Sequence, residues 1–188
     1  QESFSKAVND RKEFRPGAPF DEEGSKRAGA LGIVNELFAI YFVLNTLRLC
    51  TNLMKPAEAR KLHLNGTMAQ MVTYRYYAGR LNLFEDNYEA AEANLEYAFT
   101  HCHKDAIHNK RCILRYLVPV KLYRGRLPTA QRKPNRCFSY VDLTDTLHNA
   151  VIERYRLEEF VLLADSIRKG DLKTFNNAMT EFEHRFIR

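Results

Sequence analysis

Histidine and cysteine gather in one short stretch of the sequence, His101-Cys102-His103, with His108 and Cys112 close behind. These residue types are the commonest zinc ligands in proteins, and the H-x-H spacing also occurs in metalloprotease ligand pairs. The spacing argues against both sites, because residues i and i+2 of a helix point about 200° apart. Adjacent helical positions do not face each other, so neither flanking histidine can activate Cys102. We therefore expect no metal and no catalytic cysteine here, and we interpret both histidines as residues at a helix C-terminus, where they suit the dipole.

The sequence contains none of the common catalytic patterns. G-x-x-x-x-G-K-[ST], G-x-G-x-x-G, H-E-x-x-H and G-x-S-x-G are all absent. The paired carboxylates Glu158-Glu159 and Glu181/Glu183 are of a type used in acid–base catalysis, but such pairs usually form the solvated face of an amphipathic helix. We expect a non-catalytic protein with no cofactor and no small-molecule substrate. A metal-dependent hydrolase using His101 and His103 is the alternative from another class.

Basic residues are concentrated in one part of the chain. The 36 residues between Asp105 and Asp142 contain nine bases and no acid, whereas the whole chain has a net charge of +6, so the remainder carries −3. Such a stretch attracts phosphates or an acidic protein, and a solvated basic face is the third interpretation. The candidate nucleic-acid-binding residues are Lys121, Arg124, Arg126, Arg132, Lys133 and Arg136.

The run Tyr74-Arg75-Tyr76-Tyr77 offers aromatic rings of the kind on which bases stack. Consecutive helix positions point in different directions, so these rings cannot form one platform. We interpret the run as core and inter-helix packing.

The segments that must position these residues have the periodicity of helices. Apolar residues recur at i, i+3, i+4 and i+7, and no long stretch alternates with period two. The pattern predicts helices at about 28–56, 67–84, 87–103, 107–124, 147–169 and 171–185. Residues 1–24 are expected to be a linker or N-terminal extension, and 25–188 a single helical domain. The fold class is therefore all-α, a right-handed stack of antiparallel helical hairpins.

Local signals mark the ends of these helices and one close contact. Thr67 has the residue type of an N-cap, and Asp86-Asn87-Tyr88-Glu89 resembles a capping box. Gly79 is followed by Ala91 twelve residues later and Ala98 seven after that, with Leu95 between them. This tetratricopeptide-like spacing of small residues lets two helices approach closely.

Composition limits the class further. The chain has 188 residues, 45% of them hydrophobic, and four cysteines without C-x-x-C spacing, which indicates one domain with free thiols in a reducing compartment. The first 20 residues lack the pattern of a signal peptide. The longest apolar run, from Ala28 to Leu44, is shorter than the roughly 20 residues of a membrane span, so we expect no membrane segment.

Several strings of the sequence carry a resemblance to a known family. They are TYRYYAGR at 73–80, HCH at 101–103, NKR at 109–111 and GDLKTF at 170–175, together with residues 35–42, 47–50, 98–100, 116–121 and 186–188. Over about 24–128 and 150–188 the chain resembles the PCI domain-containing protein 2 family. The first three strings are specific to this branch, whereas G-D-L-x-x-F is the looser mark of PCI domains generally.

The resemblance implies PCI-type helical repeats that end in a winged-helix module, with no catalytic residue in the matched segments. It implies a scaffold subunit of transcription-and-export complex 2, which acts in messenger-RNA export at the nuclear pore. Its partners there would be a larger GANP-type PCI scaffold, a small acidic protein shared with the proteasome lid, and RNA or DNA. The expected location is the nucleus, with the cytoplasm as a second site. The alternative within the family is a signalosome-associated PCI subunit.

Two features depart from the family pattern. Residues 129–149 look like a loop insertion, and the chain ends at Arg188, where the family continues into the winged helix. We therefore expect the helical-repeat part, with the winged helix missing or truncated.

Overall fold

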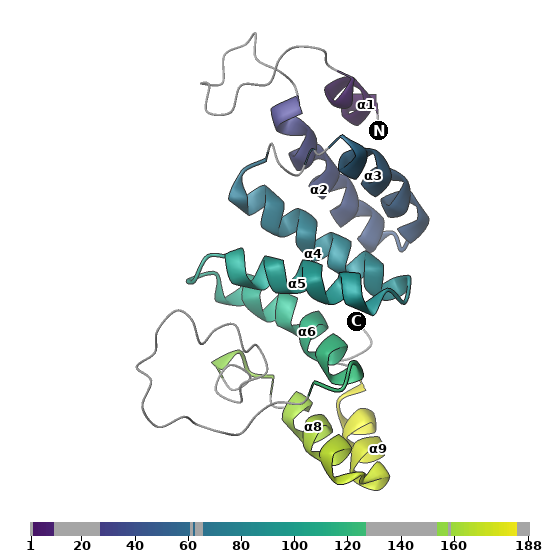
Figure 1. The fold of residues 1–188 in the computed structure, drawn as a ribbon, viewed down its shortest axis with the longest axis vertical. Coiled ribbons are helices and arrows are strands. Elements are labelled where there is room, and N and C mark those ends of the chain that lie inside the picture. The colour runs from purple at the N-terminus through teal and green to yellow at the C-terminus, as the bar shows by residue number, and fades with distance from the viewer. Residues whose placement is uncertain are drawn as a thin grey trace. The chain divides into compact units, whose positions relative to one another are not determined.

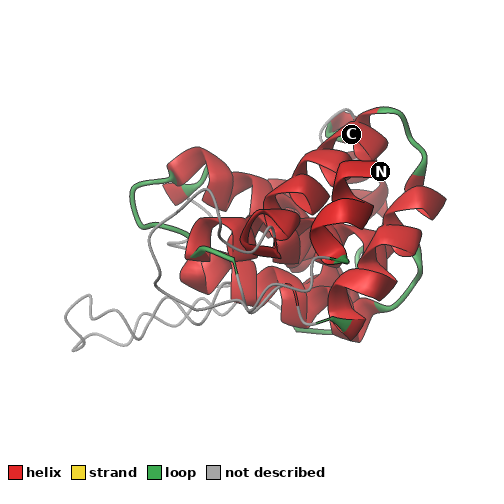
Figure 2. Cartoon of the chain, turned by 90° about the horizontal axis from the view of Figure 1, so that it is seen from above, coloured by secondary structure: helices red, strands yellow, loops and turns green. Residues whose placement is uncertain are grey.

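The structure, a computed structural model, describes residues 2–9, 27–60, 62, 66–126, 154–157 and 159–183. These residues form helices joined by turns, and no strand occurs among them (Figure 2). The chain divides into two compact units, Gln1–Cys102 and His103–Arg188. The prediction of an all-α fold is confirmed. No helix in the described ranges is long and apolar enough to cross a membrane.

Each unit is built from short helices whose neighbours along the chain pack together (Figure 1). The helices of the first unit are α1 (Glu2–Val8), α2 (Arg27–Val43), α3 (Leu47–Ala59), α4 (Met68–Phe84) and α5 (Tyr88–His101). Those of the second unit are α6 (Ile107–Tyr123), α8 (Glu159–Lys169) and α9 (Leu172–Glu181). The predicted insertion at 129–149 lies outside the described residues.

Three helical hairpins in the described ranges have the same type of turn. The first helix ends in a residue with positive φ, and the next residue is the N-cap of the second helix. That N-cap residue donates its backbone N–H to the carbonyl five positions back, which is the longer hydrogen bond of a Schellman motif. The pairs of turn residues are Asn45-Thr46 between α2 and α3, Asp86-Asn87 between α4 and α5, and Gly170-Asp171 between α8 and α9.

The first of these turns corrects the prediction of one helix over 28–56. Asn45 has φ 54° and the Thr46 N–H donates to the Tyr41 carbonyl at 2.9 Å, so α2 ends there and α3 begins. Pro56 does not end α3 but lies in its last turn. The hydrogen bond that its missing N–H removes would have gone to the Asn52 carbonyl, and Asn52 is exposed, so water can take its place.

Sequence signals at the other helix starts had mixed outcomes. The Thr67 prediction is confirmed, because Thr67 and Gln70 form a capping box that starts α4. The capping box from Asp86 to Glu89 does not form. Asn87 is the N-cap and accepts from the Ala90 N–H at 3.2 Å, while Asp86 takes the left-handed position of the turn with φ 57°.

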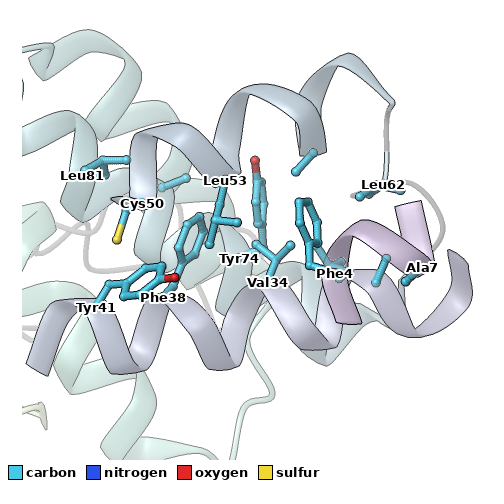
Figure 3. Packing of buried hydrophobic residues seen from close by; sticks show 14 residues of the cluster. Phe4, Ala7, Val34, Phe38, Tyr41, Cys50, Leu53, Leu62, Tyr74 and Leu81 are labelled. Atoms are coloured by element: carbon cyan, nitrogen blue, oxygen red, sulfur yellow. The ribbon is translucent and has the colours of Figure 1, made fainter. Parts of the chain in front are cut away.

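The core of the first unit lies between α1, α2, α3 and α4 (Figure 3). Phe38 of α2 stacks on Tyr74 of α4 with ring centroids 5.9 Å apart, and Val34, Cys50 and Leu53 are buried around them. Together these side chains hold α4 in place for its contact with α5.

Part of the region that was predicted to be a linker or N-terminal extension is helical. Within the predicted linker, residues 2–8 form α1, which packs on α2 and buries Phe4 and Ala7 in the core. The Arg60 guanidinium also donates to the Asn9 side-chain oxygen at 3.0 Å. Two buried side chains suffice to dock this helix of seven residues, about two turns, and such a short apolar pattern is easily missed in sequence.

The contact between α4 and α5 is as close as the small-residue spacing predicted. Ala91, Leu95 and Ala98 of α5 are completely buried. A Cβ atom on Gly79 of α4 would lie 2.6 Å from Leu95 Cγ, which is closer than real Cβ contacts. Glycine at 79 therefore sets the separation of the two helices.

In the second unit, a turn interrupts the predicted helix over 147–169: Arg154 is helical, and residues 155–157 leave the helix before α8. Arg156 has φ 53°, and α8 begins at Glu159. Tyr155 and Leu157 on either side of Arg156 are buried with Phe160 of α8. The turn thus directs apolar residues into the core while Arg156 stays exposed.

Candidate nucleic-acid interface

The structure places the six predicted nucleic-acid-binding residues in three different situations. Arg124 and Arg126 are exposed just beyond α6. Lys121, in the last turn of α6, is buried. The remaining three, Arg132, Lys133 and Arg136, lie outside the described residues. The described part therefore brings together two of the six as a surface pair.

The backbone at the end of α6 is well anchored. The Arg126 N–H donates to the Lys121 carbonyl at 2.9 Å, and the Gly125 N–H donates to the Leu122 carbonyl at 3.0 Å. Gly125 has φ 75°, so the helix ends in a Schellman motif like those of the three hairpins. This fixes the main chain from which the exposed side chains of Arg124 and Arg126 extend.

The burial of Lys121 corrects its prediction as a surface residue. Only 4% of Lys121 is exposed, and Lys110 is similarly buried at 5%. Together with Leu114 and Leu117 they occupy positions spaced by four, three and four residues, which is one stripe of a helix. That stripe is a buried face of α6. Counting charges along the sequence does not show on which face of the helix each lysine lies, although the helical spacing of these residues does.

The histidines and cysteines of the 101–112 stretch have ordinary structural surroundings. His101, the last residue of α5, stacks on Tyr97 with ring centroids 4.0 Å apart, and its Nδ1 lies 2.9 Å from the Tyr97 carbonyl oxygen. Cys102 is buried, and His103 Nδ1 lies 3.6 Å from an Asp105 carboxylate oxygen. Within the described ranges, no group of three or more His, Cys, Asp or Glu side chains could hold a metal ion.

The aromatic run of α4 packs between helices, as the sequence predicted. Tyr74 is buried, and burial raises the pKa of its phenol well above the ordinary value. Arg75 lies over the Tyr97 ring of α5 at 5.2 Å and donates to the Asn94 side-chain oxygen at 2.8 Å. The Arg80 guanidinium lies 4.3 Å from the centre of the Phe42 ring. These arginines stabilise contacts between helices through aromatic faces.

Two contacts in the second unit were not anticipated from sequence. His108 Nε2 and Cys112 Sγ lie 3.7 Å apart on α6, a pairing that the four-residue spacing permits. The Arg111 guanidinium donates to the Arg156 carbonyl at 3.3 Å, across 45 residues of sequence. No local pattern signals the second contact, because it depends on how the segment before α8 returns to α6.

The described residues define the class of protein. It is built of helical hairpins that have the same type of turn, and exposed arginines lie at one helix end. Comparison with known proteins gives the family. The chain is 37% identical over 166 residues to PCI domain-containing protein 2 of Danio rerio, and 36% identical over 166 residues to that of Xenopus laevis, with 88% of the chain covered in both cases. It is therefore a member of the PCI domain-containing protein 2 family over most of its length, and the resemblance found in the sequence is confirmed.

Other comparisons refine this relationship. The chain is 34% identical over 191 residues to the protein CSN12 homolog of Neurospora crassa, with 98% of the chain covered. It spans a little more than a third of the length of these relatives, 37% of the Danio and Xenopus proteins and 36% of the Neurospora protein. No protein-family model matches the chain.

Proposed function

We propose that this chain is part of a non-catalytic scaffold subunit of the nuclear messenger-RNA export machinery, the PCI subunit of transcription-and-export complex 2. The observation that carries the proposal is the similarity to PCI domain-containing protein 2 proteins over 88% of the chain. PCI proteins generally act as scaffolds without catalysis. The partners would be a larger GANP-type PCI protein, a small acidic protein shared with the proteasome lid, and RNA or DNA, at the nuclear pore.

The exposed arginines beyond α6 support a contact with nucleic acid. Arg124 and Arg126 belong to the acid-free stretch, as do Arg132, Lys133 and Arg136. Lys121 is left out of this surface because it is buried. Contacts of this kind are made to the phosphate backbone and carry no sequence preference.

A salt titration tests this contact. Five phosphate contacts on a single strand should give a log–log slope of affinity against salt of about −3.5, since each contact contributes about 0.7. Replacing Arg124, Arg126, Arg132 and Lys133 with Glu should abolish binding in the assembled complex and leave the far-ultraviolet circular dichroism unchanged. Unchanged binding by that variant would refute the assignment. Loss of a protein partner with retained nucleic-acid affinity would instead show that the surface docks an acidic protein.

A second candidate function has its own observation. The Neurospora crassa relative is named a CSN12 homolog, which favours a PCI subunit associated with the signalosome. Both candidates predict a scaffold, so the fold does not separate them. The two candidates are separated by identifying the proteins that are recovered with the chain.

A further inference from the structure

The second unit contains a group of basic side chains that the charge pattern alone does not assemble. Arg111 of α6 and Arg156 of the segment before α8 are joined by the hydrogen bond from the Arg111 guanidinium to the Arg156 carbonyl, at 3.3 Å. A carbonyl is neutral, so this bond orients Arg111 without neutralising its charge. Arg111 is half-buried and its Nε atom is enclosed, so the guanidinium is held in place.

The outward face of α6 adds two more bases beside Arg111. At 100° per residue, His108, Arg111 and Arg115 project within an arc of roughly 60°, and Cys112 lies within about 40° of His108. The centre of this face lies about 120° around α6 from the centre of the buried stripe that contains Lys110 and Lys121. His108 is exposed, and Arg111, Cys112 and Arg115 are half-buried.

The segment before α8 contributes the other bases. Arg154 and Arg156 are both exposed, and Arg156 has φ 53°, an uncommon conformation for a residue other than glycine. The described residues between 103 and 160 contain two acids, Asp105 and Glu159. Asp105 lies beside His103, and Glu159, at the start of α8, is only 2% exposed.

We propose that this group, which we name the Arg111 cluster and define as His108, Arg111, Arg115, Arg154 and Arg156, binds the phosphate backbone of single-stranded nucleic acid. This inference rests on the proposed function and adds a second contact surface to it, distinct from Arg124 and Arg126. Four of the five side chains are arginines, whose planar forks bind phosphate oxygens in pairs. A strand that crosses several guanidinium groups releases counterions at each contact, which favours a polyanion over an isolated phosphate.

Cys112 provides a direct probe, because it lies on the α6 face of the cluster. Cys50 and Cys102 are buried, and burial raises the pKa of the Cys50 thiol, so both should react slowly with maleimides. In the full chain carrying Cys137→Ser, the labelling rate at Cys112 is measured by mass spectrometry with and without a 30-nucleotide oligouridine. We expect the oligonucleotide to slow labelling severalfold at low salt and to have no effect at high salt.

Variants separate this inference from the proposed function. Arg154→Gln with Arg156→Gln should remove the protection of Cys112 and reduce the salt slope by about 1.4, two contacts at 0.7 each. Arg168→Gln is the matched control, because Arg168 is an exposed arginine of α8 that pairs with Asp165 at 3.1 Å. It should leave protection and slope unchanged.

Each other outcome overturns the inference in a recognisable way. Oligouridine binding that is lost on changing Arg124 and Arg126, yet unchanged on changing Arg154 and Arg156 and without protection of Cys112, would overturn the Arg111 cluster and leave the proposed function standing. No binding of oligouridine by the unaltered chain or its complex would overturn both. Protection of Cys112 by polyglutamate and not by oligouridine would replace nucleic acid with an acidic protein.

Discussion

The packing of α4 against α5 yields a prediction with a definite sign, for the substitution Gly79→Ala. In a helix interior, replacing Gly with Ala ordinarily stabilises a protein by about 0.5–1 kcal/mol. Here the new methyl group would lie 2.6 Å from Leu95 Cγ, 2.9 Å from Leu95 Cδ2 and 3.3 Å from the Leu95 backbone nitrogen. Leu95 is completely buried and cannot move aside into solvent.

The clash should therefore reverse the usual effect. Overpacking a close helix contact costs about 1–3 kcal/mol, and subtracting the helix-propensity gain leaves a net loss of up to about 2.5 kcal/mol, or about 1.2 kcal/mol at mid-range. Urea denaturation followed by circular dichroism measures this loss. Gly29→Ala in α2 is the matched control, because a Cβ there meets nothing within 4 Å, and it should gain about 0.5–1 kcal/mol.

A double variant tests the cause of the loss. If Leu95 is the obstacle, Gly79→Ala with Leu95→Ala should lose less stability than the two single variants added together. If Gly79→Ala instead stabilises the chain as much as Gly29→Ala does, α4 and α5 are not in close contact, and the hairpin described above is wrong.

Three further predictions address α5, α9 and metal content. Ala91→Leu should cost about 1–3 kcal/mol in urea denaturation because Ala91 is completely buried, and a variant as stable as wild type would count against the packing of α5. Hydrogen bonds from the Thr174 hydroxyl and backbone N–H lower the pKa of the Asp171 carboxyl below its ordinary value. The stability that this N-cap gives α9 should thus be present above about pH 4 and lost as the pH falls through the folded pKa, and Asp171→Asn should flatten that dependence in thermal melts between pH 5 and 2. Treatment with EDTA should leave the melting temperature unchanged, whereas a drop of many degrees or stoichiometric bound zinc would show a structural metal.

Much of the helical architecture could be read from periodicity and local chemistry. Thr67 followed three positions later by Gln70 gives a capping box, and the spacing of Gly79, Ala91 and Ala98 anticipates the close contact between α4 and α5. These signals succeed because each acts within one turn of helix or between two adjacent helices.

The turn between α2 and α3 was missed for a physical reason. Apolar residues continue at helical spacing on both sides of it, and the residue with positive φ is Asn45 rather than glycine. Asparagine tolerates the left-handed conformation but is a weaker turn signal than glycine. A prediction from periodicity alone therefore merges two antiparallel helices into one.

The candidate interface was predicted less well than the fold. Charge counting placed Lys121 with Arg124 and Arg126, but the phase of α6 buries Lys121. The approach of Arg156 to Arg111 spans 45 residues and depends on tertiary structure, so no sequence spacing reveals it. Surface charge is determined by which face of a helix packs, and that is decided by the rest of the fold.

The central claim is that this chain belongs to a scaffold of the messenger-RNA export machinery, and quantitative affinity purification tests it most directly. The tagged chain is expressed in its own cells at native level, and the recovered proteins are counted by mass spectrometry. The account predicts a larger PCI scaffold of the GANP type and a small acidic protein in near-equal amounts with the chain. Recovery of signalosome subunits in their place, or of neither partner, would contradict it.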